Sequence, residues 1–448
     1  MVVALNIHLK ALGCRLNEAE LESWALEFQQ AGHTLVNAVE GADLTVLNTC
    51  AVTKEAVKKS RKTINRLRRE NPTGKLIVSG CFVSTGESGS AAELGVDMLV
   101  DNKNKDQLVR KVNDHWQIPI MPEGATLPNE SALFARNRQR AFIKIQDGCR
   151  YRCSYCIVTI ARGDEKSRSQ ADIIAQINQL HDSGVQEIVL TGVHVGGYGS
   201  DIDSTLSDLV KQILTETSVP RIRFASVEPW DLGEDFFTLF ENGRLMPHMH
   251  LPIQSGSNTV LRRMSRRCHT SDFKSLVSQA RFQFPNFNIT NDVIVGFPGE
   301  TDSEWQQSLA FVEAVRFGHI HIFSYSPRAG TKAAGMSDQI SDNTKKIRNR
   351  ELHALAHSHK VQFMKSQLDQ DVNVLWEGTS STNPDTHFGY SENYTRVAVQ
   401  HEGLLENSVT KCRLESLDDQ GKYILTTLPP CQSVELRGRT SVPLVPLR

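Results

Sequence analysis

Short apolar runs alternate with amphipathic segments through the first hundred residues of the chain. The apolar runs predict strands at 5–12, 44–48, 75–80 and 97–101. Helix-like segments separate them, one beginning at Asn17 and one at Thr53, and both residues are of types that cap helix N-termini. This order of elements predicts a small, doubly wound parallel sheet.

A second alternation begins near residue 138. Its strands are predicted at 141–147, 186–192, 221–227, 247–253, 289–296 and 319–325, with helical segments between them. Six such alternations predict a partial (β/α) barrel, in which sites lie beyond the carboxyl ends of the strands. A helical pattern over 345–367 is followed by several short strands, which predict a small C-terminal β-barrel.

The pattern therefore divides an α/β chain into four parts. We predict an N-terminal domain over 1–112, a linker over 113–137, a central domain over 138–370 and a C-terminal barrel over 371–436. The linker is assigned because its proline-rich sequence carries no periodic pattern.

Composition narrows the class of protein. The chain is 39% hydrophobic and 23% charged, with a net charge of −1, which is ordinary for a globular protein. It shows no signal-peptide pattern and no apolar stretch of membrane-spanning length, so we expect a cytoplasmic protein without membrane contact. Nine cysteines in a reducing compartment favour metal or redox roles over disulfides.

A net charge near zero gives no overall attraction for nucleic acid. Nucleic acid would have to bind to local basic runs, such as the cationic helix after Thr53, although most such runs are solvated helix faces.

Three cysteines in the first domain each follow an apolar run: Cys14, Cys50 and Cys81. Because the carboxyl ends of parallel strands meet at one edge of a sheet, these thiols are expected to converge.

A second trio, Cys149, Cys153 and Cys156, forms a CxxxCxxC loop after the strand at 141–147. Three thiolates can hold an iron–sulfur cubane and leave one iron open to another ligand. A zinc site would normally add a fourth cysteine or histidine at a regular spacing, and no second CxxC occurs, although zinc remains an alternative on spacing alone.

The segment KIQDGCRYRCSYCIVTIARG resembles the cluster loop of radical S-adenosylmethionine enzymes. ALGCRLNEAE, LNTCAVTKEAVKKSR and VSGC are similar to the first domain of the methylthiotransferases within that group. LTGVHVGGYG, RFASVEP, LPIQSGS, DVIVGFPGE and FSYSPRAGTKAA follow in the family's order, so the resemblance covers nearly the whole chain. The chain departs from the family at Thr159 and Ile160, where Pro-Tyr is usual.

The resemblance implies an enzyme with two [4Fe-4S] clusters that uses S-adenosyl-L-methionine. The CxxxCxxC trio would be catalytic, with an open iron that binds the cofactor, and the first trio would hold a cluster that handles sulfur. One cofactor molecule would donate a methyl group, and another would yield a 5′-deoxyadenosyl radical. The implied cofactor contacts are Tyr155, Thr191, Gly192, Ser226, Glu228, Gln254 and Val295. We interpret His194 and Asp292 as hydrogen-bonded structural residues.

LTGVH followed by GGYG, together with NTCAVTKEA, resembles the branch that inserts a methylthio group at C2 of N6-threonylcarbamoyladenosine beside the tRNA anticodon. The implied partners are the tRNA anticodon stem-loop and a small electron donor such as flavodoxin or ferredoxin. GYSENYTRV resembles a TRAM domain, an RNA-binding barrel in which Tyr394 could stack on a base. The alternatives are the same chemistry on isopentenyladenosine or a ribosomal-protein aspartate, and a non-catalytic zinc- and RNA-binding protein.

Overall fold

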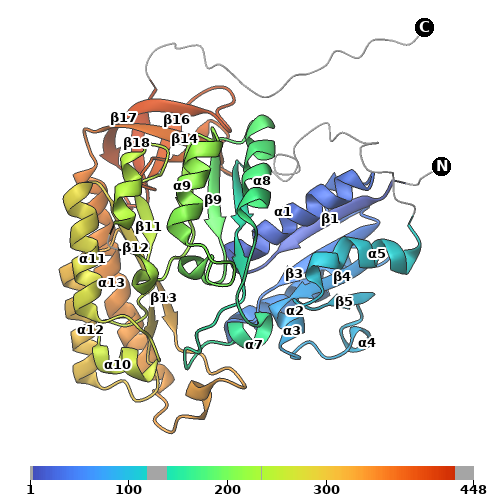
Figure 1. Cartoon of the computed structure of the whole chain (residues 1–448), viewed down its shortest axis with the longest axis horizontal. Coiled ribbons are helices and arrows are strands. Elements are labelled where there is room, and N and C mark those ends of the chain that lie inside the picture. Colours follow the sequence, from blue (N-terminus) through green and yellow to red (C-terminus); the bar gives the residue numbers. More distant parts are fainter. Residues whose placement is uncertain (1–3, 119–138, 234, 429–448) are drawn as a thin grey trace.

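The computed structural model describes residues 4–118, 139–233 and 235–428, which fold as three units (Figure 1). The N-terminal domain contains a parallel sheet in the order β2-β1-β3-β4-β5. Its strands are β1 Asn6–Ala11, β2 Thr34–Val36, β3 Leu44–Thr49, β4 Lys75–Gly80 and β5 Met98–Val100. Its helices are α1 Arg15–Gln30, α2 Lys54–Glu70, α3 Cys81–Ser84, α4 Ala91–Leu94, η1 Lys105–Gln107 and α5 Leu108–Trp116.

The N-terminal sheet is buried on both faces, as its uninterrupted apolar runs require. All six residues of β3 are buried. Trp24 and Phe28 of α1 pack with α5 on one face, whereas Ile64 and Leu67 of α2 pack with Phe82 on the other. The predicted doubly wound sheet is therefore confirmed, with one additional short edge strand, β2.

The central domain contains two three-stranded parallel sheets, β10-β9-β6 and β11-β12-β13. Isolated bridges from Ile222 to Leu245 and from Ser226 to His250 join them into a partial barrel that is open between β6 and β13. The strands are β6 Arg140–Lys144, β9 Glu187–Thr191, β10 Arg221–Phe224, β11 His248–His250, β12 Asn288–Val295 and β13 His319–Ser324, beside the small pair β7 Gln146–Asp147 and β8 Lys166–Ser167. The helices are α7 Val158–Arg162, α8 Gln170–Asp182, η2 Val195–Gly197, α9 Leu206–Glu216, η3 Pro229–Asp231, η4 Phe236–Glu241, α10 Asn258–Arg263, α11 Thr270–Gln283, α12 Asp302–Val315, η5 Lys332–Gly335 and α13 Asp342–Ser366.

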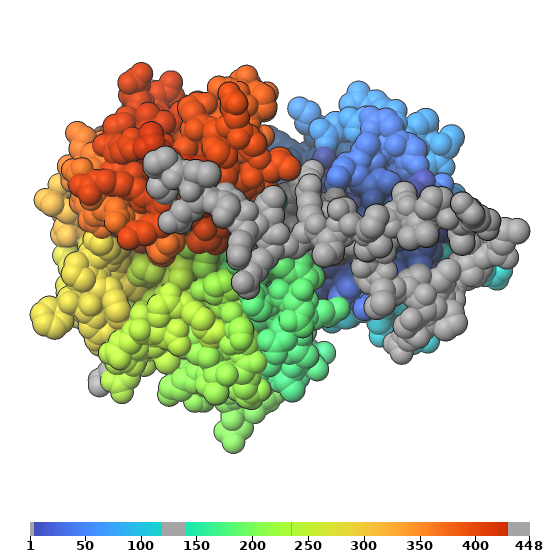
Figure 2. Space-filling model, turned by 90° about the horizontal axis from the view of Figure 1, so that it is seen from above, coloured from blue at the N-terminus to red at the C-terminus, as the bar shows by residue number. Residues whose placement is uncertain are grey.

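The C-terminal unit is a closed barrel, as predicted, in the order β14-β15-β16-β18-β17 around the buried Trp376. Its strands are β14 Asp371–Thr379, β15 Thr386–Tyr390, β16 Arg396–Gln400, β17 Val409–Leu417 and β18 Ile424–Thr427. The barrel packs on the central domain and stands apart from the N-terminal domain (Figure 2).

Two buried arginines at the start of β10 hold the C-terminal barrel in place. Arg223 donates to the carbonyls of Ser391 and Glu392, at 2.7 Å each. Arg221 also donates to the Ser391 carbonyl, at 3.1 Å. Both guanidinium groups pair with the buried Glu187 on β9, at 2.8 and 2.9 Å. The C-terminal barrel therefore sits at the N-terminal ends of the central strands.

Of the expectations about helix ends and the linker, one is confirmed and two differ from the structure. Thr53 caps α2 as predicted, because its side chain accepts from the Ala56 amide. Asn17, however, does not cap α1, which begins two residues earlier, at Arg15. The Asn17 amide instead donates to the carbonyls of Leu12 and Thr49, at 2.6 and 3.0 Å, and so ties together the chain just after β1 and the end of β3. Helix α5 extends to Trp116, into the predicted linker, whose residues 119–137 lie outside the described residues, as do 429–436 of the predicted C-terminal domain.

The expectation that Tyr394 stacks on an RNA base is wrong. Its ring stacks on Tyr390 at 4.6 Å and on His248 at 4.7 Å, with interplanar angles of 18° and 23°. The guanidinium groups of Arg140 and Arg223 also approach it, at 5.1 and 5.0 Å from the ring centroid. Tyr394 is therefore packed between the central domain and its own barrel.

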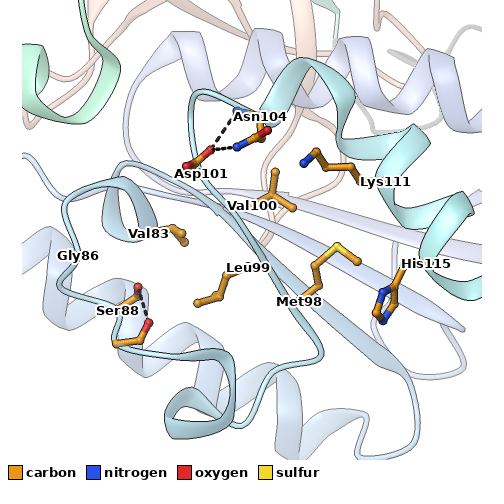
Figure 3. A pocket seen from close by; sticks show the side chains of 11 residues that line it. Val83, Gly86, Ser88, Met98, Leu99, Val100, Asp101, Asn104, Lys111 and His115 are labelled. Carbon is orange, nitrogen blue, oxygen red and sulfur yellow. Dashed lines mark hydrogen bonds between the residues drawn. The ribbon is translucent and has the colours of Figure 1, made fainter.

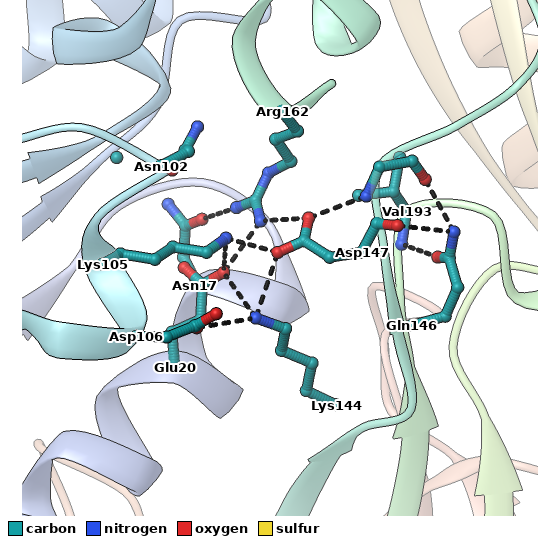
Figure 4. Close-up of polar contacts among 12 residues, drawn as sticks. Asn17, Glu20, Asn102, Lys105, Asp106, Lys144, Gln146, Asp147, Arg162 and Val193 are labelled. Carbon is teal, nitrogen blue, oxygen red and sulfur yellow. Dashed lines mark hydrogen bonds and ion pairs between the residues drawn. The ribbon is translucent and has the colours of Figure 1, made fainter. Parts of the chain in front are cut away.

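A buried ion-pair network joins the N-terminal domain to the central domain (Figure 4). Arg162 of α7 pairs with Glu20 of α1 at 2.8 Å and with Asp147 at 3.0 Å. Lys105 pairs with the same two carboxylates, and Lys144 pairs with Asp147 at 3.0 Å. Burial alone would raise the pKa of Glu20, but the charges of Arg162 and Lys105 hold it at about 2. The contribution of Glu20 to stability is therefore complete above its ordinary pKa of roughly 4.5 and is lost as the pH falls through about 2.

We expect Glu20→Gln to destabilise the N-terminal domain by about 3 kcal/mol, because the buried cations Lys105 and Arg162 then share Asp147 as their one carboxylate partner among these pairs. Urea unfolding followed by tryptophan fluorescence would measure this, since the indole of Trp24 donates to the Lys105 carbonyl at 3.1 Å. Glu70→Gln is the matched control, because Glu70 forms an exposed pair with Arg66 at 3.6 Å, worth about 0.5 kcal/mol. Equal unfolding midpoints for the two variants would contradict the proposed importance of the buried network.

Candidate functional site

The structure brings Cys14, Cys50 and Cys81 to one edge of the N-terminal sheet. They directly precede α1, follow β3 and begin α3, at the carboxyl ends of three adjacent strands. Gly13 has φ +99°, and a Cβ there would lie 2.6 Å from the Cys50 Cβ, so only glycine allows this close approach. Burial, with the Cys14 and Cys81 thiols nearby, raises the pKa of Cys50 to about 11.

The second trio lies on the loop between β7 and α7. The loop is held by its own backbone, since the Ser154 amide donates to the Met264 carbonyl at 2.9 Å and the Ala333 amide donates to the Ser154 carbonyl at 2.8 Å. The Val158 amide donates to Cys156 Sγ at 3.4 Å, and Arg266 lies 3.8 Å from Cys153 Sγ. Donors of this kind stabilise thiolates, which are the form that binds metal.

The number of cysteine ligands bears on the two metal interpretations. Tetrahedral zinc with ligand bonds of ~2.3 Å needs sulfurs about 3.8 Å apart. Neither trio is among the described groups whose ligand atoms all lie within 4.8 Å of one another. Cys149 lies instead in such a group with Glu165 and His194. A cubane binds each thiolate to a different iron, so three cysteines are sufficient to hold it, whereas a structural zinc ion normally takes four protein ligands.

Arg162 and its neighbours connect the two trios. Arg162 donates to Asn17 Oδ1 at 2.8 Å, and this same oxygen lies 3.6 Å from Cys14 Sγ. Asn102 lies 3.6 Å from Cys81 Sγ and donates to the Ala161 carbonyl at 2.8 Å. The helix that follows the CxxxCxxC loop therefore contacts the residues that surround the first trio.

The predicted cofactor contacts lie at or just beyond the carboxyl ends of the central strands. Thr191 ends β9, and a Cβ on Gly192 would lie 2.9 Å from Gln146 Oε1. Val295 ends β12, and its carbonyl accepts from the Tyr325 amide at 2.9 Å. Tyr155 packs beside Tyr325 in a small apolar cluster.

The remaining three contacts lie on the neighbouring strands. Ser226 forms a bridge with His250, and Gln254, at φ +80°, forms a bridge with Val293. Burial raises the pKa of Glu228, and one of its carboxylate oxygens has no hydrogen-bond partner in the described part of the chain. A buried acceptor without a partner is suited to a ligand that donates hydrogen bonds. The structure thus places six of the seven positions at the carboxyl ends of the central strands and the seventh, Tyr155, in the CxxxCxxC loop, and their roles stay predictions.

His194 and Asp292 have structural partners, as interpreted from the sequence. His194 bonds to Glu165 and, at 2.6 Å, to Asp231. Although burial opposes it, these two hydrogen bonds raise the pKa of His194 to about 9. Asp292 accepts from His250 at 3.1 Å.

Sequence reasoning missed the residues that link the trios, chiefly Arg162, Glu20 and Lys105. They come from distant parts of the chain and carry no shared motif. One local signal was available, since Lys144 and Asp147 place opposite charges at the end of an apolar strand.

One open pocket of about 550 Å³ lies elsewhere, at the edge strand β5 (Figure 3). Met98, Val100, Lys111 and His115 are among its lining residues. It contains none of the six cysteines or seven predicted contacts, so we assign it no part in the chemistry.

No helix in the described ranges is both long and apolar enough to cross a membrane.

Comparison with known families matches two regions of the chain. Residues 6–101 match the uncharacterized protein family UPF0004, and residues 143–312 match the radical SAM superfamily. These regions contain the first and the second cysteine trio, respectively.

Curated relatives extend over nearly the whole chain. The threonylcarbamoyladenosine tRNA methylthiotransferase MtaB of Bacillus subtilis (strain 168) is 34% identical over 91% of this chain and 93% of its own length. The protein of the same name from Thermotoga maritima is 34% identical, over 93% and 96%. The tRNA-2-methylthio-N(6)-dimethylallyladenosine synthase of B. subtilis is also 34% identical, over 86% of this chain and 79% of its own length.

Solved structures support the fold alone. The radical S-adenosylmethionine methyltransferase TsrM from Kitasatospora setae superposes with a TM-score of 0.54 at 14% identity, covering 74% of this chain and 77% of that one. OxsB, a cobalamin-dependent S-adenosylmethionine radical enzyme, has a TM-score of 0.51 at 12% identity, over 81% and 58%. With identity of this level to full-length curated relatives and both cysteine trios in place, the chain belongs to the radical S-adenosylmethionine methylthiotransferase family.

Proposed function

We propose that the protein inserts a methylthio group at C2 of N6-threonylcarbamoyladenosine next to the anticodon of tRNA. The observation that carries this proposal is that the helix after the CxxxCxxC loop contacts the residues around the first trio, through Arg162 with Asn17 and Asn102 with the Ala161 carbonyl. Sulfur insertion needs a radical site and a sulfur-holding site within reach of one atom, and these contacts join the two domains that would carry them. The names and lengths of the MtaB relatives support the choice of nucleoside.

The chain's own residues would position and shield this chemistry. When bound, two [4Fe-4S] clusters and S-adenosyl-L-methionine would supply the radical, the sulfur and the methyl group. The buried pairs of Arg162 with Glu20 and Asp147 hold the two trios in one orientation. Helix α1 packs on β6 through Ala19 and Phe142, so the N-terminal domain is also joined to the central domain by an apolar contact.

The C-terminal barrel is suited to bind RNA, although not through Tyr394. Arg396 lies over the Phe388 ring at 4.3 Å from its centroid, with Tyr423 at 5.9 Å, and all three are partly exposed. Lys360 of α13 continues this surface, since its ammonium donates to the Lys422 carbonyl at 3.3 Å. Cations interleaved with aromatic rings bind phosphates and bases together. As further parts of the proposal, the electron donor is a small protein such as flavodoxin or ferredoxin, and the enzyme works in the cytoplasm.

We expect tRNA from cells that lack this gene to lose 2-methylthio-N6-threonylcarbamoyladenosine and to regain it on complementation. Nucleoside mass spectrometry of bulk tRNA measures both. If the nucleoside that disappears is the 2-methylthio-dimethylallyl derivative, the protein carries out the reaction named for the tRNA-2-methylthio-N(6)-dimethylallyladenosine synthases instead. If neither nucleoside changes, the proposal fails.

The two trios should have separable roles. Cys153→Ala should abolish formation of 5′-deoxyadenosine, whereas Cys50→Ala should retain it and lose methylthiolation, and each variant should keep about four irons per chain. Cys268→Ala is the matched control, because Cys268 is a buried thiol outside both trios. Normal methylthiolated product from Cys50→Ala would contradict a cluster at the first trio.

Arg396→Gln should weaken tRNA binding about tenfold and lower the salt dependence of log Kd by about one, as expected for a lost phosphate contact. Filter binding at several salt concentrations measures both quantities. Arg413→Gln, which removes an exposed cation from the same barrel, is the control. Unchanged affinity for Arg396→Gln would exclude this face of the barrel as the RNA surface.

A further inference from the structure

Helix α2 concentrates positive charge on an otherwise acidic chain. Its 17 residues include eight lysines and arginines but only two acidic residues, so the helix carries a net charge of +6. The whole chain has a net charge of −1, so the residues outside α2 are together acidic. Charges on a solvated helix face are commonly of both signs, and those of α2 are almost all of one sign.

Four of these cations form a single row along the exposed side of α2. Residues four positions apart lie on one face of a helix, about 6 Å apart along its axis. The members of this cationic row are Lys54, Lys58, Lys62 and Arg66, and all four are exposed. The row is therefore about 18 Å long, whereas the opposite side of the helix is buried in the N-terminal domain.

Contacts within the protein do not account for the cationic row. The ammonium groups of its three lysines have no hydrogen-bond or ion-pair partner in the described parts of the chain, and Arg66 pairs only with the exposed Glu70, at 3.6 Å. Arg68, which lies outside the row, instead donates to the Leu94 carbonyl at 3.4 Å. The cationic row is therefore free to bind a ligand.

The cationic row destabilises its own helix. Like charges four residues apart repel, and Lys54, the first residue of α2, lies at the end where the helix dipole disfavours a cation. A bound anion would replace this repulsion with attraction. Because the charges are evenly spaced along a line, they suit a linear polyanion such as a nucleic-acid backbone better than one compact anion.

The cationic row begins at the interface between the N-terminal and central domains. Helix α2 starts four residues after Cys50 of the first trio, and Ser60 on its buried side donates to the Cys50 carbonyl at 3.0 Å. The Lys54 amide donates to Ser326 Oγ at 3.1 Å. Ser326 lies two residues beyond β13, an edge strand at the open side of the partial barrel. The row therefore begins beside the carboxyl end of β13, whereas the C-terminal barrel lies at the N-terminal ends of the central strands.

We propose that the cationic row binds consecutive backbone phosphates of the tRNA anticodon arm. This inference rests on the proposed function and adds a second RNA contact, on the N-terminal domain, to the one on the C-terminal barrel. Phosphate contacts fix the orientation of an RNA but do not read its sequence. The two contacts, at opposite ends of the central strands, hold the arm in one orientation while other residues recognise the modified nucleoside.

Filter binding of tRNA to the cluster-loaded, full-length protein at several salt concentrations tests this. Lys58→Gln/Lys62→Gln should weaken binding about thirtyfold at physiological salt and lower the slope of log Kd against log salt by nearly two, because each lost phosphate contact releases one counterion fewer. The same losses are expected with the isolated anticodon stem-loop. The variant should unfold at the same temperature as the wild type or higher, because it removes a repulsive pair, so unfolding would not explain the weaker binding.

Arg110→Gln/Lys111→Gln is the matched control. It removes two positive charges from α5, which packs on the opposite face of the N-terminal sheet, and should leave the affinity and the salt slope unchanged. Equal weakening in both double variants would reveal only general electrostatic attraction and would overturn the inference. Unchanged tRNA binding by the α2 variant would also overturn it. If that variant is instead reduced by dithionite but no longer by reduced flavodoxin, the row binds an acidic protein.

Turnover separates this inference from the proposed function. At saturating tRNA the α2 variant should still form the methylthiolated nucleoside, so its KM rises with little change in kcat. If the wild type methylthiolates tRNA and the α2 variant matches it in KM, the proposed function stands and only this surface fails. If the wild type methylthiolates no tRNA, the proposed function fails, whatever the row binds.

Discussion

Buried charge determines how the domains of this protein fit together. A buried ion is stable only when it is paired, and Glu20, Lys105, Asp147 and Arg162 come from both sides of the interface. Any rotation of the N-terminal domain would separate at least one of these pairs at a cost of several kcal/mol. Asp147 and Arg162 flank the CxxxCxxC loop, and Asn17 lies behind Cys14, so the same contacts set the distance between the two trios.

A second polar anchor acts at the opposite end of the central strands. Glu187, Arg221 and Arg223 are buried at the starts of β9 and β10, where they attach the C-terminal barrel through backbone carbonyls. The two anchors leave one side of the partial barrel uncovered. This side lies between the edge strands β6 and β13.

Hydrophobic periodicity predicted the N-terminal parallel sheet, the partial barrel and the C-terminal barrel, because burial on one or two faces of an element repeats apolar residues at a regular spacing in the sequence. The hydrogen-bond partners of polar side chains could be predicted less well from the sequence. Thr53 and Asn17 have similar capping ability, yet Asn17 is used to join two strand ends, since its amide can both donate and accept. Tyr394 is an aromatic residue of the kind that stacks on RNA bases, but its ring is packed between the central domain and the C-terminal barrel. Arg162 meets Asn17 across 145 residues of sequence, and no single-sequence pattern predicts a pairing of that range.

The relatives constrain where substrate choice can reside. Proteins named for threonylcarbamoyl and for dimethylallyl adenosines are each 34% identical to this chain, so the shared chemistry does not distinguish them. The two nucleosides differ only in the N6 substituent, and that difference is one negative charge with its hydroxyl against a hydrocarbon. A site with a donor placed to bind the carboxylate favours the acidic substrate, whereas an apolar site favours the hydrocarbon. Substrate choice therefore resides in the residues that contact the N6 substituent, while the six thiols and the interdomain ion pairs can serve either reaction.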